Sequence, residues 1–118
     1  MGNIVWLASY PKSGNTWIRA FLANLVANRS GAVTLAELPA YGRLEADPEL
    51  YSRVAGRPSV ELDFDELCAL RPQVHAALAA AATRSVFVKT HSMAAVHDGV
   101  PLITPQVTAG AICVVRNP

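Results

Sequence analysis

The sequence predicts an α/β domain with a doubly wound parallel sheet and flanking helices. Three short apolar runs, residues 4–8, 85–89 and 111–115, have the length and the flanking turns of buried strands. Segments with helical spacing separate these runs, and strands that alternate with helices form parallel sheets. The 118 residues suffice for one domain, and a hydrophobic content of 52% against 16% charged residues predicts a well-packed core.

The first predicted helix follows the first strand after a short turn. Asn15 or Thr16 suits the position that caps its start, and residues 28–31 supply its stop. Within residues 17–26 the apolar side chains recur at helical spacing and form one stripe, which consists of Ile18, Phe21, Leu22, Leu25 and Val26.

The middle of the chain predicts less regular structure. Prolines and glycines interrupt residues 34–62, which favours short helices within an irregular excursion. Residues 63–67 are typical of a helix start because acidic side chains occupy the first turn. A further helix is expected to begin at Arg71 and Pro72 and to run to Ala82. For residues 92–110 we expect a loop with a short helix near Pro105.

The net charge of +1 conceals an asymmetry. Residues 37–66 contain eight of the nine acidic residues and three arginines, so this segment carries −5 and the remainder +6. The remainder would form a basic pole suited to a multiply anionic ligand. Scattered, solvated charge explains the acidic segment equally well. Nucleic acid is not an expected partner, because no Lys/Arg run with interleaved aromatic residues is present.

The cysteines and the N-terminus indicate a cellular location. Cys68 and Cys113 lie far apart in apolar contexts, so we expect two buried, reduced thiols and no zinc site. The N-terminal apolar run is too short for a signal peptide or a membrane span and has no basic segment before it. The expected location is therefore cytoplasmic, without a membrane partner.

The turn after the first strand has the composition of a phosphate-binding loop. Residues 9–17 read Ser-Tyr-Pro-Lys-Ser-Gly-Asn-Thr-Trp. The first N–H groups of a helix lack internal partners and carry partial positive charge, so they bind anions. Gly14 permits close backbone approach or a positive φ. Lys12 adds a full charge, and the hydroxyls of Ser13 and Thr16 can donate to oxyanions. The alternative is an ordinary strand-to-helix turn with a surface lysine.

Other polar side chains follow the second and third strands. Lys89 and His91 lie at or just after the second strand, and Arg116 follows the third. In open α/β sheets, ligands bind beyond the carboxyl ends of the strands. If the strands are parallel, these three side chains and Lys12 converge around one crevice.

Three motifs carry a resemblance to a known family. A Walker loop has its lysine after the second glycine, whereas Lys12 precedes Gly14. Pro-Lys-Ser-Gly-x-Thr-Trp at residues 11–17 instead resembles the 5′-phosphosulfate loop of the sulfotransferases that use 3′-phosphoadenosine-5′-phosphosulfate (PAPS). Lys-Thr-His at 89–91 resembles the segment with the family's catalytic base, and Val-Val-Arg-Asn-Pro at 114–118 resembles the start of its 3′-phosphate motif. The motifs stand in the family's order, although Asn15 replaces the commonest Thr.

The resemblance implies a PAPS-dependent enzyme with a P-loop-like fold that transfers a sulfuryl group to a hydroxyl or amine of a small molecule, without a metal. The resemblance implies that His91 is the catalytic base and that Lys12 stabilises the leaving group. Lys89 either steadies the transferring sulfonate or merely ends the strand. The residues implied to bind the cofactor are Lys12, Ser13, Gly14, Asn15, Thr16, Trp17 and Arg116.

Several alternatives stay open at this point. Trp17 would stack on adenine or pack along the helix stripe, His91 would otherwise be a capping or core histidine, and Arg116 would otherwise face solvent. A small-molecule kinase or NTPase with a P-loop and a non-catalytic nucleotide-binding fragment are the competing functions. Because the chain stops after its third predicted strand, we expect residues 1–118 to be the N-terminal part of one sulfotransferase domain, with weak cofactor binding and little activity.

Overall fold

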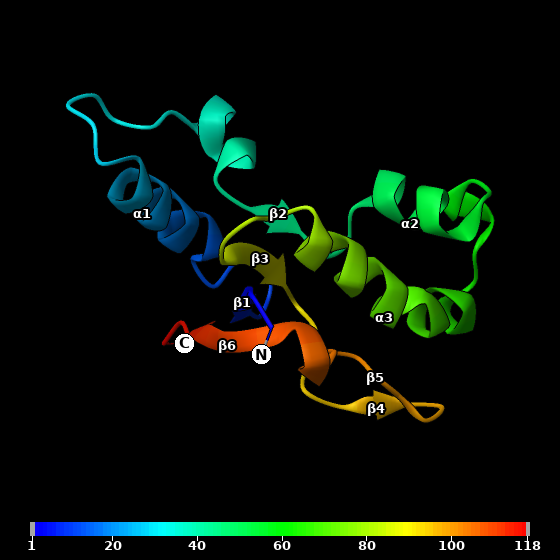
Figure 1. The fold of residues 1–118 in the computed structure, drawn as a ribbon. Helices are drawn as coiled ribbons and strands as arrows, with labels where there is room; N and C mark the ends of the chain where they lie inside the picture. The colour runs from blue at the N-terminus through cyan, green and yellow to red at the C-terminus, as the bar shows by residue number, and fades with distance from the viewer. Residues whose placement is uncertain (1, 118) are drawn as a thin grey trace.

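The computed structural model describes residues 2–117 and contains a four-stranded parallel sheet flanked by helices (Figure 1). The strand order is β2 (Arg43–Leu44), β3 (Val86–Thr90), β1 (Ile4–Ser9) and β6 (Thr108–Val114). The central strand β1 pairs in parallel with both β3 and β6. The predicted α/β class and the parallel sheet are thus confirmed, and the carboxyl ends of the three long strands meet at one edge.

The short strand β2 was not predicted. It has only two residues, which pair with Val88 and Lys89 of β3. Gly42 precedes it, and a Cβ at this glycine would lie 3.2 Å from the carbonyl oxygen of Phe87, so a larger residue would crowd β3. A two-residue strand is too short to show an alternating pattern of apolar residues. It forms because it pairs with the neighbouring strand, which the local sequence does not indicate.

The helices and the remaining strands connect these four strands. None of the helices in residues 2–117 is long and apolar enough to cross a membrane. The short helices expected in residues 34–62 and near Pro105 are present, whereas the hairpin of β4 and β5 was not predicted. The elements are α1 (Asn15–Ala27), η1 (Leu35–Ala40), α2 (Pro48–Ala55), η2 (Ser59–Glu61), α3 (Phe64–Ala80), β4 (Val96–His97), β5 (Val100–Pro101) and η3 (Pro105–Val107).

Helix α3 is continuous, so the prediction of a second helix starting at Arg71 and Pro72 is wrong. Pro72 lies inside α3, where a proline removes one backbone hydrogen bond and usually breaks or kinks the helix. The helix continues because buried residues on both sides of the proline, Cys68 before it and Val74 and Leu78 after it, hold it in the core.

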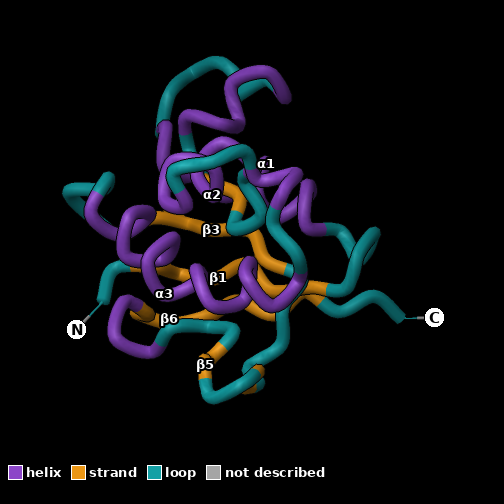
Figure 2. The backbone as a smooth tube through the Cα atoms, turned by 90° about the vertical axis from the view of Figure 1, so that its right-hand side faces the viewer, coloured by secondary structure: helices purple, strands orange, loops and turns teal. Residues whose placement is uncertain are grey.

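Two apolar clusters lie on different sides of the sheet (Figures 1 and 2). The larger one packs α2 and α3 against the face of the sheet that carries Ile4, Trp6 and Val88. Its other buried members are Leu50, Tyr51, Val74 and Leu78. The smaller one joins α1 and η1 around Ala23, Val33 and Leu38.

Helix α1 does not pack through the apolar stripe that its sequence contains. Its buried side is the alanine side, with Ala23 in the core and Ala20 and Ala27 packed against the same cluster. Phe21 and Leu25 are 62% and 64% exposed. The small alanines allow η1 to approach α1 closely, and this packing decides which face is covered.

The two cysteines differ in exposure. Cys68 is buried in α3, as expected, but the prediction that Cys113 is buried is wrong. Cys113 belongs to β6, which forms an edge of the sheet, and alternate residues along this strand are exposed. Because side chains alternate between the two faces of a strand, one face of β6 is left open.

Candidate functional site

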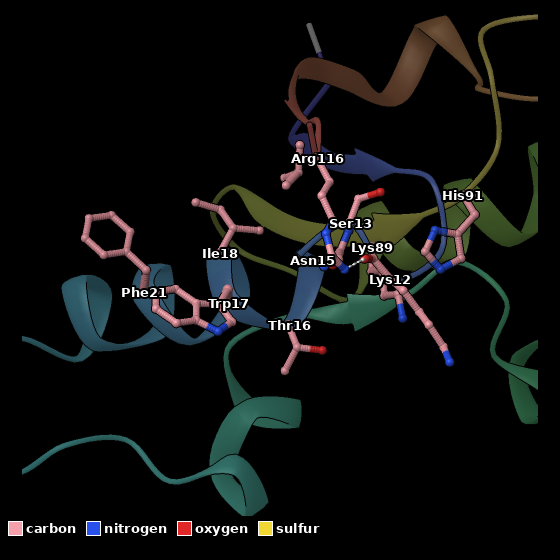
Figure 3. A pocket seen from close by; sticks show the side chains of 12 residues that line it. Lys12, Ser13, Asn15, Thr16, Trp17, Ile18, Phe21, Lys89, His91 and Arg116 are labelled. Carbon is pink, nitrogen blue, oxygen red and sulfur yellow. Dashed lines mark hydrogen bonds between the residues drawn. The ribbon is translucent and has the colours of Figure 1, made fainter. Parts of the chain in front are cut away.

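The carboxyl ends of β1, β3 and β6 surround a cavity of about 760 Å³ (Figure 3). The structure brings all nine predicted site residues to this one cavity. They are Lys12, Ser13, Gly14, Asn15, Thr16, Trp17, Lys89, His91 and Arg116. Three further residues of its lining, Ile18, Phe21 and Val114, were not predicted.

The loop between β1 and α1 ends in a helix start without a side-chain cap. Gly14 is the N-cap with a φ of 99°, so the prediction that Asn15 or Thr16 caps the helix is wrong. No side chain within residues 2–117 caps α1. Ile18 N donates the first backbone hydrogen bond to Gly14 O, so the N–H groups of residues 15 to 17 have no acceptor inside the helix. An uncapped helix start of this kind favours an anion.

The side chain of Asn15 points away from the cavity and back to β1. Its Nδ2 donates to Leu7 O at 2.9 Å and to Ser9 Oγ at 3.0 Å, and the residue is buried. Its Oδ1 is buried without a hydrogen-bond partner within residues 2–117. The amide therefore ties the loop to the end of β1, and the backbone N–H is the group of Asn15 left for a ligand.

Replacing Asn15 with alanine is expected to lower the free energy of unfolding by about 1–3 kcal/mol, because the buried carbonyl of Leu7 loses its side-chain donor. Urea denaturation of Asn15→Ala measures this loss. The exposed Asn117→Ala serves as the control, and equal stability of the two variants would contradict the structural role of Asn15.

His91 links the turn after β3 to the end of β1. Its Nδ1 lies 2.7 Å from the carbonyl oxygen of Ser9, and because a carbonyl only accepts, Nδ1 carries the hydrogen. The neutral ring then keeps a free lone pair on Nε2. The side chain is exposed, so the alternative of a core histidine does not hold.

Three cationic side chains line the same cavity. Lys12 has a positive φ of 59° in the loop, and Lys89 is the next-to-last residue of β3. In Figure 3 the amino groups of both side chains point the same way. Arg116 donates from Nη1 to Lys12 O at 3.4 Å, which turns its guanidinium back onto the loop. Within residues 2–117, no Asp or Glu lines the cavity. The site therefore favours an anionic ligand.

An aromatic wall stands across the site from His91 (Figure 3). It consists of Trp17, which is 85% exposed, and Phe21, one helical turn further along α1. The ring of Trp17 is almost fully exposed, so it is not part of the core. Exposed ring faces at the edge of a cationic cavity suit a flat heteroaromatic group.

A buried polar cluster behind the site was missed by the sequence analysis. Its centre is Glu45, whose Oε1 accepts from Arg71 Nη1 at 2.5 Å and from Tyr51 OH at 3.2 Å. His75 Nε2 lies 3.3 Å from the same oxygen. Burial by itself would raise the pKa of Glu45, but the hydrogen bond from His75 and the charge of Arg71 outweigh it and lower the pKa. Burial and the charge of Glu45 raise the pKa of Tyr51.

Nothing in the spacing of these residues indicates such a cluster. Glu45 belongs to the acidic segment that is equally well explained as solvated charge, and Arg71 stands where a helix start was expected. His75 is completely buried in α3, as a structural histidine would be.

Comparisons of the chain with protein-family models, with curated protein sequences and with solved structures each find no match. Inference about its function therefore rests on the site and on the sequence motifs.

Proposed function

We propose that this site carries out PAPS-dependent transfer of a sulfuryl group to a hydroxyl or amine of a small molecule. One observation carries the proposal: a single cavity gathers an uncapped helix start, three cationic side chains and a histidine with a free Nε2. The strand, loop and helix at its centre follow a P-loop-like plan in which lysine precedes glycine, as in the resembling sulfotransferase loop.

The residues present fit such a donor. The N–H groups of residues 15 to 17 and the hydroxyls of Ser13 and Thr16 would hold the 5′-phosphosulfate. The guanidinium of Arg116 offers a fork to the 3′-phosphate, and Trp17 offers a ring face to adenine. The volume of about 760 Å³ lies in the range of ordinary ligand sites, roughly 300–1,000 Å³. When bound, PAPS supplies the sulfuryl group and leaves as adenosine 3′,5′-bisphosphate.

The chain's own residues then have distinct tasks. His91 accepts the acceptor's proton on Nε2 while its Nδ1–H stays on the carbonyl of Ser9, which keeps the ring in place. Lys12 and Lys89 bring positive charge to the phosphate loop, where negative charge grows on the leaving group.

The acceptor would approach through a second cavity of about 320 Å³ that also reaches His91. It opens between the end of β2 and the turn after β3. Its lining consists of Leu44, Glu45, Ala46, Arg71, Lys89, Thr90, His91 and Ser92. His91 and Lys89 line both cavities, so a group placed here can meet the donor at these two side chains.

A kinase or NTPase fits the site less well. Mg²⁺, which such enzymes use to hold phosphates, takes oxygen ligands and usually one or two carboxylates. No carboxylate within residues 2–117 lines the phosphate cavity, and Lys12 precedes Gly14 instead of following it. These two observations favour the sulfotransferase proposal.

Binding of the product nucleotide tests the proposal directly. Adenosine 3′,5′-bisphosphate at 100 times its dissociation constant is expected to add about 2.7 kcal/mol of stability, and ADP much less, because ADP lacks the 3′-phosphate. Thermal unfolding with each nucleotide measures the difference. Lys12→Ala and Arg116→Ala should lose the effect, whereas Arg84→Ala, an exposed arginine outside the cavity, should keep it. Equal stabilisation by ADP, or stabilisation only with Mg²⁺, would favour the kinase instead.

A further inference from the structure

An ion pair between Glu45 and Arg71 lies buried directly behind the turn that carries His91. The side chain of Glu45 is 5% exposed and that of Arg71 is 16% exposed. A buried ion pair is costly to desolvate and often adds no stability over a well-packed apolar pair. Its place next to the candidate site therefore calls for an explanation beyond packing.

Both chain neighbours of His91 are attached to this ion pair. Arg71 Nη1 donates to Ser92 Oγ at 2.8 Å as well as to Glu45. Thr90 Oγ1 lies 3.4 Å from Glu45 Oε2 and accepts from Ser92 N at 3.0 Å. The residues before and after His91 are thus held by the two charged groups and by each other.

The ion pair is itself held firmly. Glu45 N donates to Lys89 O at 3.0 Å, which extends the pairing of β2 with β3. His75 bridges Glu45 and Thr104, since its Nδ1 lies 2.8 Å from Thr104 Oγ1. His75 is fully buried, and its ring packs edge-on against Trp6 at 4.8 Å between centroids. The cluster thereby anchors the turn to the sheet and to α3.

His91 has no comparable packing of its own. Its side chain is exposed, and its one hydrogen bond within residues 2–117 joins Nδ1 to Ser9 O across two strand ends. That bond forms only if the turn after β3 places His91 Nδ1 within hydrogen-bond distance of Ser9 O at the end of β1. The direction of Nε2 therefore depends on what holds Thr90 and Ser92.

We propose that Arg71 and Glu45 are positioning residues for His91. They hold Thr90 and Ser92 so that the Nδ1–H of His91 reaches Ser9 O and Nε2 is left to accept a proton in the cavity. Both residues also line the cavity proposed for the acceptor, but in this role they act through Thr90 and Ser92 and not on the reacting atoms. The inference rests on the proposed function for the task of His91 as base, but the placement of the ring can be measured without any reaction.

Nitrogen NMR of the histidine rings, recorded on the full chain at a pH where the rings are neutral, tests the placement. The wild type is expected to hold His91 in the Nδ1–H tautomer. Thr90→Val and Ser92→Ala each remove one link, and Arg71→Lys keeps the charge but removes the Nη1 group that contacts both Glu45 and Ser92. In all three, His91 should shift toward the Nε2–H tautomer that unconstrained imidazole prefers. Ser59→Ala and Arg57→Lys, which alter residues outside the cluster, should leave His91 unchanged.

The His75 signals report whether the buried cluster is intact, so a lost fold is recognised in the same spectra. If Arg71→Lys disrupts these signals, Thr90→Val and Ser92→Ala decide the question. An unchanged His91 tautomer in the variants that keep their His75 signals would overturn the proposal.

Kinetics give a second readout that separates this inference from the proposed function. If sulfuryl transfer is measurable, kcat should fall about tenfold in Ser92→Ala, within the roughly 10²-fold that a misplaced catalytic group costs, while KM for the donor changes little. An unchanged kcat would count against the positioning role. A tautomer shift in variants of a chain that neither transfers a sulfuryl group nor binds adenosine 3′,5′-bisphosphate would refute the proposed function and leave the positioning role supported.

Discussion

Replacing His91 with asparagine is expected to lower the rate of sulfuryl transfer roughly 10²–10⁴-fold, the usual contribution of a well-placed general base. The asparagine amide can take the place of Nδ1 and still donate to Ser9 O, so the turn keeps its attachment to β1. It offers no nitrogen lone pair to accept a proton. Initial rates with PAPS and a panel of alcohols and amines measure the loss, and the affinity for adenosine 3′,5′-bisphosphate should be nearly unchanged.

The matched control is His97→Asn. His97 lies in β4, where its Nε2 is 2.8 Å from Asp65 Oδ1, and it does not line the cavity. This variant should retain the wild-type rate. If His91→Asn also retains it, His91 is not the base. If the wild type binds the bisphosphate but transfers nothing to any acceptor, a non-catalytic nucleotide-binding fragment is the better interpretation.

Glu45→Gln is expected to lower the free energy of unfolding by about 3–5 kcal/mol, the usual cost of removing one partner of a buried ion pair. Arg71 would lose its counter-charge in the interior, and His75 would lose a carboxylate as its hydrogen-bond partner. Urea denaturation measures the loss, with the exposed Glu61→Gln as the control. In a double-mutant cycle with Arg71→Met, the two losses should be far from additive, since both variants remove the same interaction. Additive losses would show that the pair is not coupled.

The acid dependence of stability provides an independent check on Glu45. Folding lowers the pKa of this carboxyl, so its contribution is complete above its unfolded-state pKa of about 4.3 and is lost as the pH falls through the folded-state pKa. Glu45→Gln should therefore lose less stability on acidification than the wild type. Glu37, whose pKa is lowered to about 2 by the backbone N–H of Thr34 and by Arg29, contributes equally in both proteins. Parallel stability curves would contradict the assignment.

Local sequence signals predicted the long strands and the loop between β1 and α1 that lines the cavity. The apolar runs that became β1, β3 and β6 lie between turn residues, so each is recognisable without knowledge of its neighbours. The position of the site followed from one further inference, that parallel strands bring their carboxyl ends to one edge. This inference named Lys12, Lys89, His91 and Arg116, and the composition of the loop and the family resemblance supplied the other five predicted residues that line the cavity.

Predictions failed where neighbouring elements override a local preference. Pro72 ends a helix in isolation, but buried residues on either side of it keep α3 continuous. The apolar stripe of α1 is the obvious face to bury, yet the alanine face packs better against η1. Asn15 is a good helix cap by composition, but its amide is used by Leu7 O and Ser9 Oγ. In each case a contact with another segment outweighs the intrinsic tendency.

By itself, the sequence determined the nine predicted residues of the candidate site, because a strand followed by a polar loop is a local pattern. Strands that alternate with helices also predict a parallel sheet, which brings the ends of these strands together. Only the tertiary structure decided what stands behind the site. Glu45 and Arg71 are 26 residues apart in the chain and meet because the residue after β2 lies against the side chain of Arg71 from α3. Which charges pair in a core depends on how helices and strands pack together, and spacing along the chain does not encode that packing.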